Sequence, residues 1–438
     1  MEIVVRIKEA LWKAFLATFL FLVVYLFYNS EIVRANTEDI AFDVINKFYI
    51  NTDSKDTNSS ELLIFAVDDL YMKEQELYDS DNTANYGYLF PRDHIASFIT
   101  RVDELVSEIA PKHFPKALFI DYDMRFTMQP YGKVLSKEDQ VLLDVLKKPR
   151  PYTILLPKTG KYNFINDSND TGMQKKISEK KIIFVSVPLL QSSDDIVRRY
   201  QSYQQVSDGN MSKDYIGIVP ALWQILRNKP VDINMSKKLF MKNDIVGNRI
   251  WIKSYRPAQQ EDECTVQKSY WKKLTKYSAN CSLFEIVEED FANSILLLGG
   301  THTHNDDRFD VLNVGSSSSL SGIDMQANAL LTSLSLNGSL QRLPLWISLL
   351  LVFFTFLMID VLLSILFTLI KIQNSKIQFI VLLIINATIL IMLSIYILEQ
   401  YHMWFNWFVP FLLLQMVEVI EKIQKQVPKL TKKLRRKK

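Results

Sequence analysis

Apolar residues gather at the two ends of this chain of 438 residues and leave a polar middle between them. Near the start, residues 10–28 are apolar except for Lys13. Three more apolar segments follow one another towards the end, at residues 344–370, 377–397 and 403–420. A helix of about 20 apolar residues crosses the hydrocarbon core of a bilayer, and a lysine near its end extends to the headgroups. The sequence therefore predicts one transmembrane helix at the start of the chain and three near its end.

Basic residues indicate which side of the membrane each part faces. Four spans place the N-terminus, the turn at 371–376 and the C-terminal tail on one side, and all three are basic. The turn at 399–402 on the other side has no lysine or arginine. Because cytoplasmic loops carry an excess of these residues, we expect both termini in the cytoplasm of a bacterial cell and the large domain outside its inner membrane. The predicted parts are residues 1–28 (N-terminus and first span), 29–343 (extracytoplasmic domain), 344–420 (three spans) and 421–438 (basic tail).

A cleaved signal peptide is the alternative for the first apolar segment. Its start is basic, and residues 33–35, Val-Arg-Ala, offer a cleavage site of the usual kind. The apolar run is long for such a peptide and ends in bulky residues, which favours a retained span. Cleavage leaves three spans and the same orientation.

Cys264 and Cys281 are the two cysteines of the chain, and both lie in the predicted external domain. Disulfides persist outside the cytoplasm, so we expect the two to pair and to close a short loop, worth ~3 kcal/mol in the chain-entropy model. Two unpaired thiols are the alternative. No histidine lies at ligand spacing from either cysteine, and a zinc site is therefore not expected.

Strand and helix patterns alternate through the polar middle of the chain. Apolar runs of strand length lie at residues 61–69, 117–121, 152–156, 181–187 and 294–298, with an alternating pattern at 248–255. Helical patterns lie at residues 40–48, 91–109, 136–146, 218–227 and 283–291. Unbroken apolar runs are typical of strands buried on both faces, and their alternation with helices indicates an α/β fold with a mixed, largely parallel sheet.

Residues 295–371 tie the external domain to the membrane. The segment begins with the last apolar run, passes through a polar loop, and continues as an amphipathic stretch at 322–336, where apolar residues recur at helical spacing from Ile323 to Leu334. Pro344 and the second span follow. The segment is therefore predicted to form a strand, a loop, a helix and a span, with few residues between the domain and the bilayer.

Polar residues follow three of the predicted strands, and these strand ends are candidates for a ligand site. Ligands of open α/β sheets bind beyond the carboxyl ends of the strands, where carboxylates can also do acid–base work. The alternative is that each aspartate caps the next helix or pairs with an arginine. The candidate ligand-binding residues are Asp68, Asp69, Arg92, Asp121, Asp123, Arg198, Thr301 and Asp306.

Other kinds of chemistry find little support in the sequence. Two histidines and two aspartates lie within residues 302–307, but a polar loop fixes no geometry, and we expect no metal site. No nucleophile elbow, phosphate-cradling loop, dinucleotide fingerprint or zinc-protease motif occurs. We therefore expect no catalysis, no cofactor and no nucleic acid partner. A hydrolase that uses Asp68 and Asp121 is the weakest alternative, because no nucleophile accompanies them.

Polar residues in and beside the predicted spans suggest two further contacts. Asp360 and Asn386 lie at nearly the same depth of an antiparallel helix pair, so we expect a hydrogen bond between them to join the second and third spans. A contact of Asp360 with a partner's helix and a proton path are the alternatives. The tail at 422–438 can bind anionic lipid headgroups, or it serves only as a topology signal.

The order of these motifs resembles the CHASE2 family, an extracellular sensory module associated with cyclases and histidine kinases. The order and the four-span frame carry the resemblance, since no single motif is specific. Ile196 departs from the family pattern, which prefers glycine there. The matching motifs are Val67-Asp68-Asp69, Gly87 with Phe90-Pro91-Arg92, Ala96, and residues 117–121, 195–199, 248–256, 296–301, 322–323 and 327–329.

The resemblance implies a sensory role without catalysis. Family members often continue into a cytoplasmic kinase or cyclase, and no such motif follows the last span here, so we expect the output to be carried by another membrane or envelope protein. An unidentified external ligand or partner would then shift the 322–336 helix, which leads into the second span. The alternative is a structural or assembly subunit of a cell-envelope complex, whose external domain docks other subunits.

Overall fold

The computed structural model divides the chain into two compact units. One comprises Met1–Tyr49 and Leu340–Lys438, and the other comprises Ile50–Ser339. We call them the helical unit and the sheet unit and describe each by itself. The described residues are 2–27, 31–49, 62–79, 84, 89–128, 135–158, 163–165, 171–191, 196–208, 211–240, 249–250, 255–257, 265–269, 274–281, 283, 288–302, 307–310, 319–370, 375–417, 419–420 and 423.

The sheet unit is built on a central sheet whose described strands follow the order β4-β3-β2-β12-β1-β11-β10-β9. Neighbours from β4 to β11 pair in parallel, whereas β10 pairs antiparallel with both β11 and β9. The predicted α/β fold with a largely parallel sheet is therefore confirmed. The strands are β1 (Leu62–Val67), β2 (Ala117–Asp121), β3 (Thr153–Pro157), β4 (Ile182–Val185), β9 (Tyr255–Pro257), β10 (Thr265–Ser269), β11 (Leu274–Ser278) and β12 (Ile295–Gly300).

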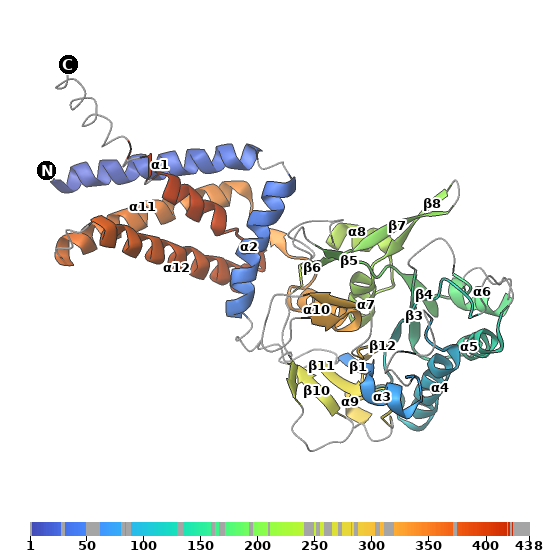
Figure 1. The fold of residues 1–438 in the computed structure, drawn as a ribbon. Coiled ribbons are helices and arrows are strands. Elements are labelled where there is room, and N and C mark those ends of the chain that lie inside the picture. The colour runs from blue at the N-terminus through green and yellow to red at the C-terminus, as the bar shows by residue number, and fades with distance from the viewer. Residues whose placement is uncertain are drawn as a thin grey trace. The chain divides into compact units, whose positions relative to one another are not determined.

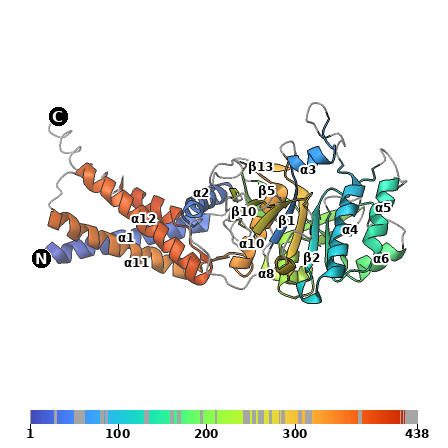
Figure 2. The ribbon, with the colours of Figure 1, turned by 90° about the horizontal axis from the view of Figure 1, so that it is seen from below.

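Helices cover both faces of this sheet (Figures 1 and 2). One face packs against α4 (Arg92–Glu108) and α5 (Lys137–Lys147), whose apolar residues form one core with alternate residues of β1 such as Phe65. The other face is covered by α10 (Gly322–Ser335), with α7 (Ile218–Leu226) beside it. All six residues of β1 are buried, as expected of an apolar run enclosed from both sides.

Several elements were not predicted from the sequence pattern. The short helix α3 (Asp69–Glu74) begins where a loop was expected, because Asp68 caps it, and α6 (Thr171–Ser178) lies in an expected polar excursion. Helix α4 starts one residue after Pro91, which is its N-cap rather than its first residue. Three small antiparallel pairs are polar or very short, so they lack an apolar run. The remaining elements are β5 (Leu189–Gln191), β6 (Val197–Tyr200), β7 (Tyr203–Asp208), β8 (Met211–Ile216), β13 (Arg308–Asp310), β14 (Ser319–Ser321), η1 (Pro111–His113), α8 (Ile233–Leu239) and α9 (Glu288–Phe291).

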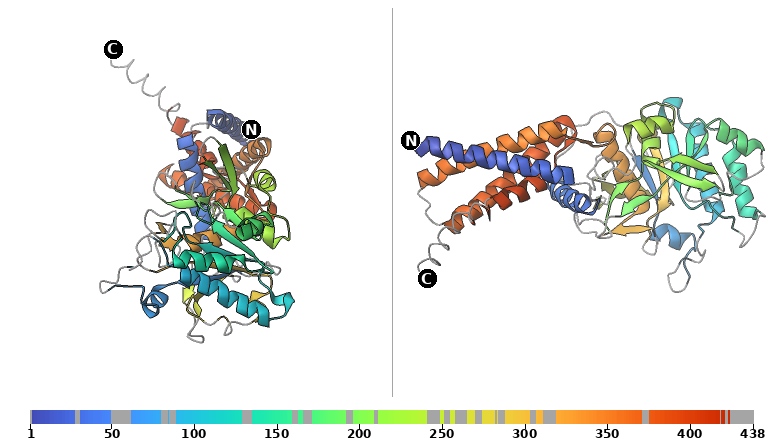
Figure 3. Two further views of the ribbon diagram at one scale, coloured as in Figure 1. Left: turned by 90° about the vertical axis from the view of Figure 1, so that its right-hand side faces the viewer. Right: turned by 90° about the horizontal axis from the view of Figure 1, so that it is seen from above.

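The helical unit consists of long apolar helices (Figures 1 and 3). The helices α1 (Glu2–Phe27), α11 (Leu345–Ile370) and α12 (Ser375–Tyr401) lie side by side, and α2 (Glu31–Tyr49) contacts α12 near one end of the bundle. A short parallel bridge joins β15 (Gln341–Arg342) to β16 (Met403–Trp404). The segment that precedes α11 is thereby fastened to the loop that follows α12.

Two stretches of the described residues are long and apolar enough to cross a membrane, Leu345–Leu362 and Ile380–Tyr401. Ala10–Val24 and Phe408–Val417 are also apolar helices, but they are shorter. They correspond to the first and fourth predicted spans, so the described helices support two of the four and leave the four-span arrangement unconfirmed.

The polar contact inside the helical unit differs from the predicted one. The ammonium group of Lys13 on α1 lies 3.3 Å from a carboxylate oxygen of Asp360 on α11. The side chain of Asn386 is buried, and neither its nitrogen nor its oxygen has a hydrogen-bond partner within the part of the chain that is described. The expected Asp360–Asn386 bond is therefore wrong, because a lysine that we expected to extend to the headgroups satisfies the aspartate instead.

Some predictions lie outside the described residues. Cys264 is one of these positions, so the Cys264–Cys281 disulfide stays a prediction, and Cys281 itself is buried just after β11. Asp306 and, apart from Ile423, the basic tail at 422–438 lie outside them as well.

Candidate functional site

The carboxyl ends of β2, β12 and β1 lie side by side at one edge of the sheet. Asp121 at the end of β2 lies beside Gly299 of β12, and Gly299 lies beside Ala66 of β1. Just past the strands, the backbone N–H of Thr301 donates to the carbonyl of Val67 at 3.0 Å. The structure thus brings the three predicted polar clusters to one place, which we call the sheet edge.

Asp68 and Asp69 organise the turn that follows β1. The Asp68 carboxylate accepts hydrogen bonds from the backbone N–H of Tyr71 at 2.8 Å and from the hydroxyl of Ser278 at 3.2 Å. The hydroxyl of Tyr78 donates to the Asp69 carboxylate. Asp68 is therefore a helix cap, the role that the sequence left open as the alternative to ligand binding.

A tyrosine and a histidine meet on the helices beside this turn. The hydroxyl oxygen of Tyr71 lies 2.8 Å from Nδ1 of His94 on α4. Burial raises the pKa of Tyr71 to about 12, so its hydroxyl keeps its proton at neutral pH. The sheet edge thus contains a neutral phenol as well as carboxylates.

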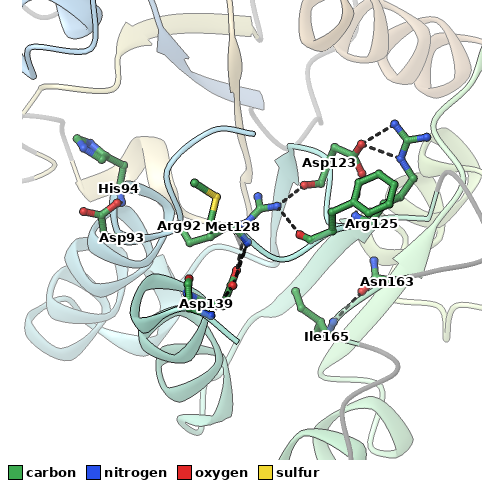
Figure 4. A network of polar contacts seen from close by, with 11 residues as sticks. Arg92, Asp93, His94, Asp123, Arg125, Met128, Asp139, Asn163 and Ile165 are labelled. Carbon is green, nitrogen blue, oxygen red and sulfur yellow. Dashed lines mark hydrogen bonds and ion pairs between the residues drawn. The ribbon is translucent and has the colours of Figure 1, made fainter. Parts of the chain in front are cut away.

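Arg92 is fully buried at the start of α4 and fixes the loop after β2 (Figure 4). Its Nη2 donates to the backbone carbonyl of Asp123 at 2.6 Å and to that of Phe126 at 3.4 Å. Its Nε lies 4.0 Å from a carboxylate oxygen of Asp139 on α5. Burial lowers the pKa of Arg92 to about 10, which still leaves it charged at neutral pH. Arg92 therefore holds α4, α5 and the loop together.

The carboxylate of Asp123 is already engaged by its near neighbour Arg125. Nη2 and Nε of Arg125 lie 2.6 and 2.7 Å from the same carboxylate oxygen, and the Arg125 backbone N–H donates to the other oxygen at 2.8 Å (Figure 4). The hydrogen bond to the Asp123 carboxylate raises the pKa of Arg125. The carboxylate of Asp123 thus pairs with Arg125, whereas Arg92 contacts the backbone carbonyl of Asp123.

Asp121 and Asp307 form the most unusual electrostatic feature of the sheet edge. Packing around its carboxyl group, and secondly the charge of Asp307, raise the pKa of Asp121 well above its ordinary value. Much of Asp307 is exposed, but its carboxylate lies against Gly322, where a Cβ would approach it to 1.8 Å. The pKa of one carboxyl group is therefore raised by a second one, which lies beside the first residue of α10.

Helix α10 packs tightly on this edge. A Cβ on Gly299 would lie 2.9 Å from Cβ of Ile323, so β12 and α10 approach one another as closely as a glycine permits. The backbone N–H of Gly322 donates to the carbonyl of Asp307 at 2.9 Å, and the hydroxyl of Ser321 caps the helix. All residues from Gly322 to Ser333 are buried.

Buried polar contacts connect α10 to other segments of the sheet unit. The ammonium group of Lys276 on β11 lies 3.3 Å from both carboxylate oxygens of Asp324. The amide of Gln326 donates to the carbonyl of Val187 at 2.7 Å. Near the end of the helix, a third contact joins the hydroxyls of Ser333 and of Tyr200 on β6, 2.8 Å apart. Contacts at several points along α10 therefore fix the helix to other segments of the sheet unit.

The remaining candidates are placed less centrally. Arg198 is buried in β6, part of a separate two-stranded pair, and its carbonyl accepts from the backbone N–H of Ile250. Sequence reasoning missed the Lys276–Asp324 ion pair and the electrostatic coupling of Asp307 to Asp121, because each joins residues far apart in the chain. Serine three positions before Asp324 was a usable sign of a helix start.

The described residues of the sheet edge contain no cluster of three or more histidine, cysteine, aspartate or glutamate side chains that could hold a metal ion. What they present is a carboxyl group with a raised pKa, phenol hydroxyls and backbone groups. This arrangement suits the binding of a polar ligand or of a peptide segment by hydrogen bonds.

The sheet unit is thus an α/β domain with polar strand ends, and the described residues of the chain also include two helices long and apolar enough to cross a membrane. A family model for the CHASE2 domain matches residues 17–364, and the chain therefore belongs to the CHASE2 domain family, a family of extracellular sensory domains. Comparisons with curated proteins and with solved structures found no match.

Proposed function

We propose that this protein is a bacterial inner-membrane sensor whose external domain binds a ligand or a protein partner at the sheet edge. It passes the bound state through its membrane helices to a separate protein, and it performs no catalysis itself. The observation that carries the proposal is α10, which starts at the sheet edge, is buried along its length, and precedes α11 by a few residues.

The physical basis is that α10 is held at several points by specific contacts. A ligand that binds Asp121 or Asp307 also affects Gly322, the first residue of the helix, because the Asp307 carboxylate lies against this glycine. Since Lys276 holds α10 near its start and Tyr200 holds it near its end, the helix responds as a rigid element rather than by fraying. The chain then continues through residues 336–344 into α11.

The proposed orientation has both termini in the cytoplasm and residues 29–343 outside it, with four spans. The basic residues of the N-terminus, of the turn at 371–376 and of the tail support this orientation. A disulfide between Cys264 and Cys281 fits an oxidising compartment. The tail at 421–438 would then face the anionic lipids of the cytoplasmic leaflet.

Two reporter fusions test the orientation. A reporter that is active only outside the cytoplasm is inserted within residues 52–60 or attached to Lys438. We expect activity from the fusion within residues 52–60 alone. Activity of the Lys438 fusion would contradict the orientation, and a cytoplasmic reporter at Lys438 serves as the control.

Cross-linking in intact cells, followed by purification of the full chain, tests the separate output protein. We expect a histidine kinase, a cyclase or another output enzyme to be recovered in proportion to the bait. Its recovery should change in an Asp121→Asn variant and not in a Lys175→Gln variant, which alters an exposed residue of α6. Recovery of a fixed multi-subunit assembly, in the same amount with the Asp121→Asn variant as with the wild type, would favour the alternative of a structural subunit of the envelope.

A further inference from the structure

The helical unit contains a cavity where the ends of its helices meet. The cavity has a volume of about 60 Å³ and is lined by apolar side chains that include Phe21 and Val24 near the end of α1, and Val409 after β16. One water molecule needs roughly 10–15 Å³ on this measure, so the cavity has room for several waters or for one phosphate-sized group.

Two opposite charges border this cavity, whose lining also includes the polar side chains of Ser348 and Asn406. Glu38 of α2 is 4% exposed, and its carboxylate accepts a hydrogen bond from Nε1 of Trp404 at 2.6 Å. Nη2 of Arg342 lies 3.9 Å from the other carboxylate oxygen, which is beyond hydrogen-bond distance. The acid and the base therefore border the same space as an ion pair whose charged atoms lie 3.9 Å apart, and together they add no net charge.

The elements around the cavity place it at one end of the apolar helices. α1 approaches it with its last turns, α11 with its first turn at Ser348, and α12 with the loop that follows it. Trp404 lies beside the cavity, and Trp407 donates to the carbonyl of Ala41 nearby at 3.1 Å. In the proposed membrane arrangement this end of the apolar helices lies at the headgroup level, where tryptophans are enriched.

We propose that this cavity binds the headgroup of a zwitterionic phospholipid of the phosphatidylethanolamine kind. The guanidinium of Arg342 binds the phosphate, the carboxylate of Glu38 accepts from the ammonium, and the apolar wall around Val409 contacts the start of the acyl chains. A site with one cation and one anion complements a zwitterion better than an anionic lipid. The assignment rests on the proposed membrane insertion of the helical unit, in which the lipid belongs to the outer leaflet.

Photolabelling of the full chain in nanodiscs tests the assignment. The nanodiscs are made of phosphatidylglycerol with a minor fraction of photoactivatable phosphatidylethanolamine, and the labelled peptides are identified by mass spectrometry. We expect labelling of residues 340–348 and 403–409. Val409→Phe fills the cavity, and Leu412→Phe adds the same ring at an exposed position of the same helix. Labelling should fall about tenfold in the first variant and stay unchanged in the second.

Two further measurements keep the result interpretable if Val409→Phe folds poorly. Arg342 is only partly buried, so Arg342→Gln should fold, and its labelling should also fall about tenfold because the phosphate loses a charged donor. Unlabelled phosphatidylethanolamine should compete and extra phosphatidylglycerol should not.

Two results overturn the proposal. One is equal competition by phosphatidylethanolamine and phosphatidylglycerol, and the other is labelling that is as strong in Val409→Phe and Arg342→Gln as in the wild type. Competition by free phosphoethanolamine as strong as that by the lipid overturns the lipid assignment and identifies a soluble zwitterion instead. The reporter fusions at 52–60 and at Lys438 are read independently. A failure of the lipid site therefore leaves the proposed orientation untouched, and a reversed orientation leaves the labelling result valid but moves the site to the other leaflet.

Discussion

The contact between Gly299 and Ile323 can be probed with a single methyl group. In a Gly299→Ala variant the new Cβ lies 2.9 Å from Cβ, 3.1 Å from Cγ1 and 3.3 Å from Cγ2 of Ile323. Cβ is attached directly to the backbone of α10, so a change of rotamer at Ile323 cannot relieve the closest contact. Either α10 or β12 must shift.

Overpacking of a buried contact by a methyl group costs about 1–3 kcal/mol of unfolding free energy. For a domain of this size that corresponds to a fall of about 2–12 °C in the unfolding temperature. Ile323→Ala removes the Cγ atoms but leaves Cβ in place. The double variant should therefore fall short of the summed losses of the single variants, with a coupling of roughly 0.5–3 kcal/mol.

Pulse proteolysis of the full chain in nanodiscs, at a series of temperatures, measures the unfolding of the sheet unit. The cut sites within residues 50–339 report this unit alone. An unfolding temperature of Gly299→Ala equal to that of the wild type would refute the close approach of β12 and α10. Strict additivity with Ile323→Ala would refute their direct contact.

Three further predictions concern buried charges. Asp121→Asn should stabilise the sheet unit at neutral pH. Because the pKa of Asp121 is raised in the folded protein, its ionisation destabilises the fold above the ordinary pKa of 3.8, and this penalty disappears as the pH falls towards that value. The melting temperatures of the variant and the wild type should therefore converge in acid. Asp360→Leu should cost about 3 kcal/mol in detergent melts by removing the ion pair with Lys13, and adding Lys13→Leu should restore most of it. Arg92→Met should lower the melting temperature, because two backbone carbonyls lose a charged donor worth ~1.5–3 kcal/mol, and an unchanged melt would contradict this.

The core of the sheet could be predicted because its strands carry their signal locally. Residues 62–67 and 295–300 are unbroken apolar runs, and only a strand buried on both faces suits such a run in a chain of this composition. Their parallel pairing followed from the helices between them. The shared sheet edge of Asp68, Asp121 and Thr301 then followed from the parallel pairing.

The contacts within that edge could not be predicted, because they join residues distant in sequence. Asp121 and Asp307 are 186 positions apart (307 − 121), and nothing in either neighbourhood marks the other. The partner of Asp360 was mistaken for a similar reason. Asn386 lies at a similar depth on the helix that follows in sequence, whereas the ion pair comes from Lys13 on α1.

Hydrogen–deuterium exchange on the full chain in nanodiscs tests most directly whether α10 carries the state of the sheet edge to the membrane helices. Exchange is compared between the wild type and Gly299→Ala, peptide by peptide. We predict faster exchange in α10, residues 322–335, and also in residues 336–350, which include the first turn of α11. Faster exchange that stops at the end of α10 would contradict the proposed transmission.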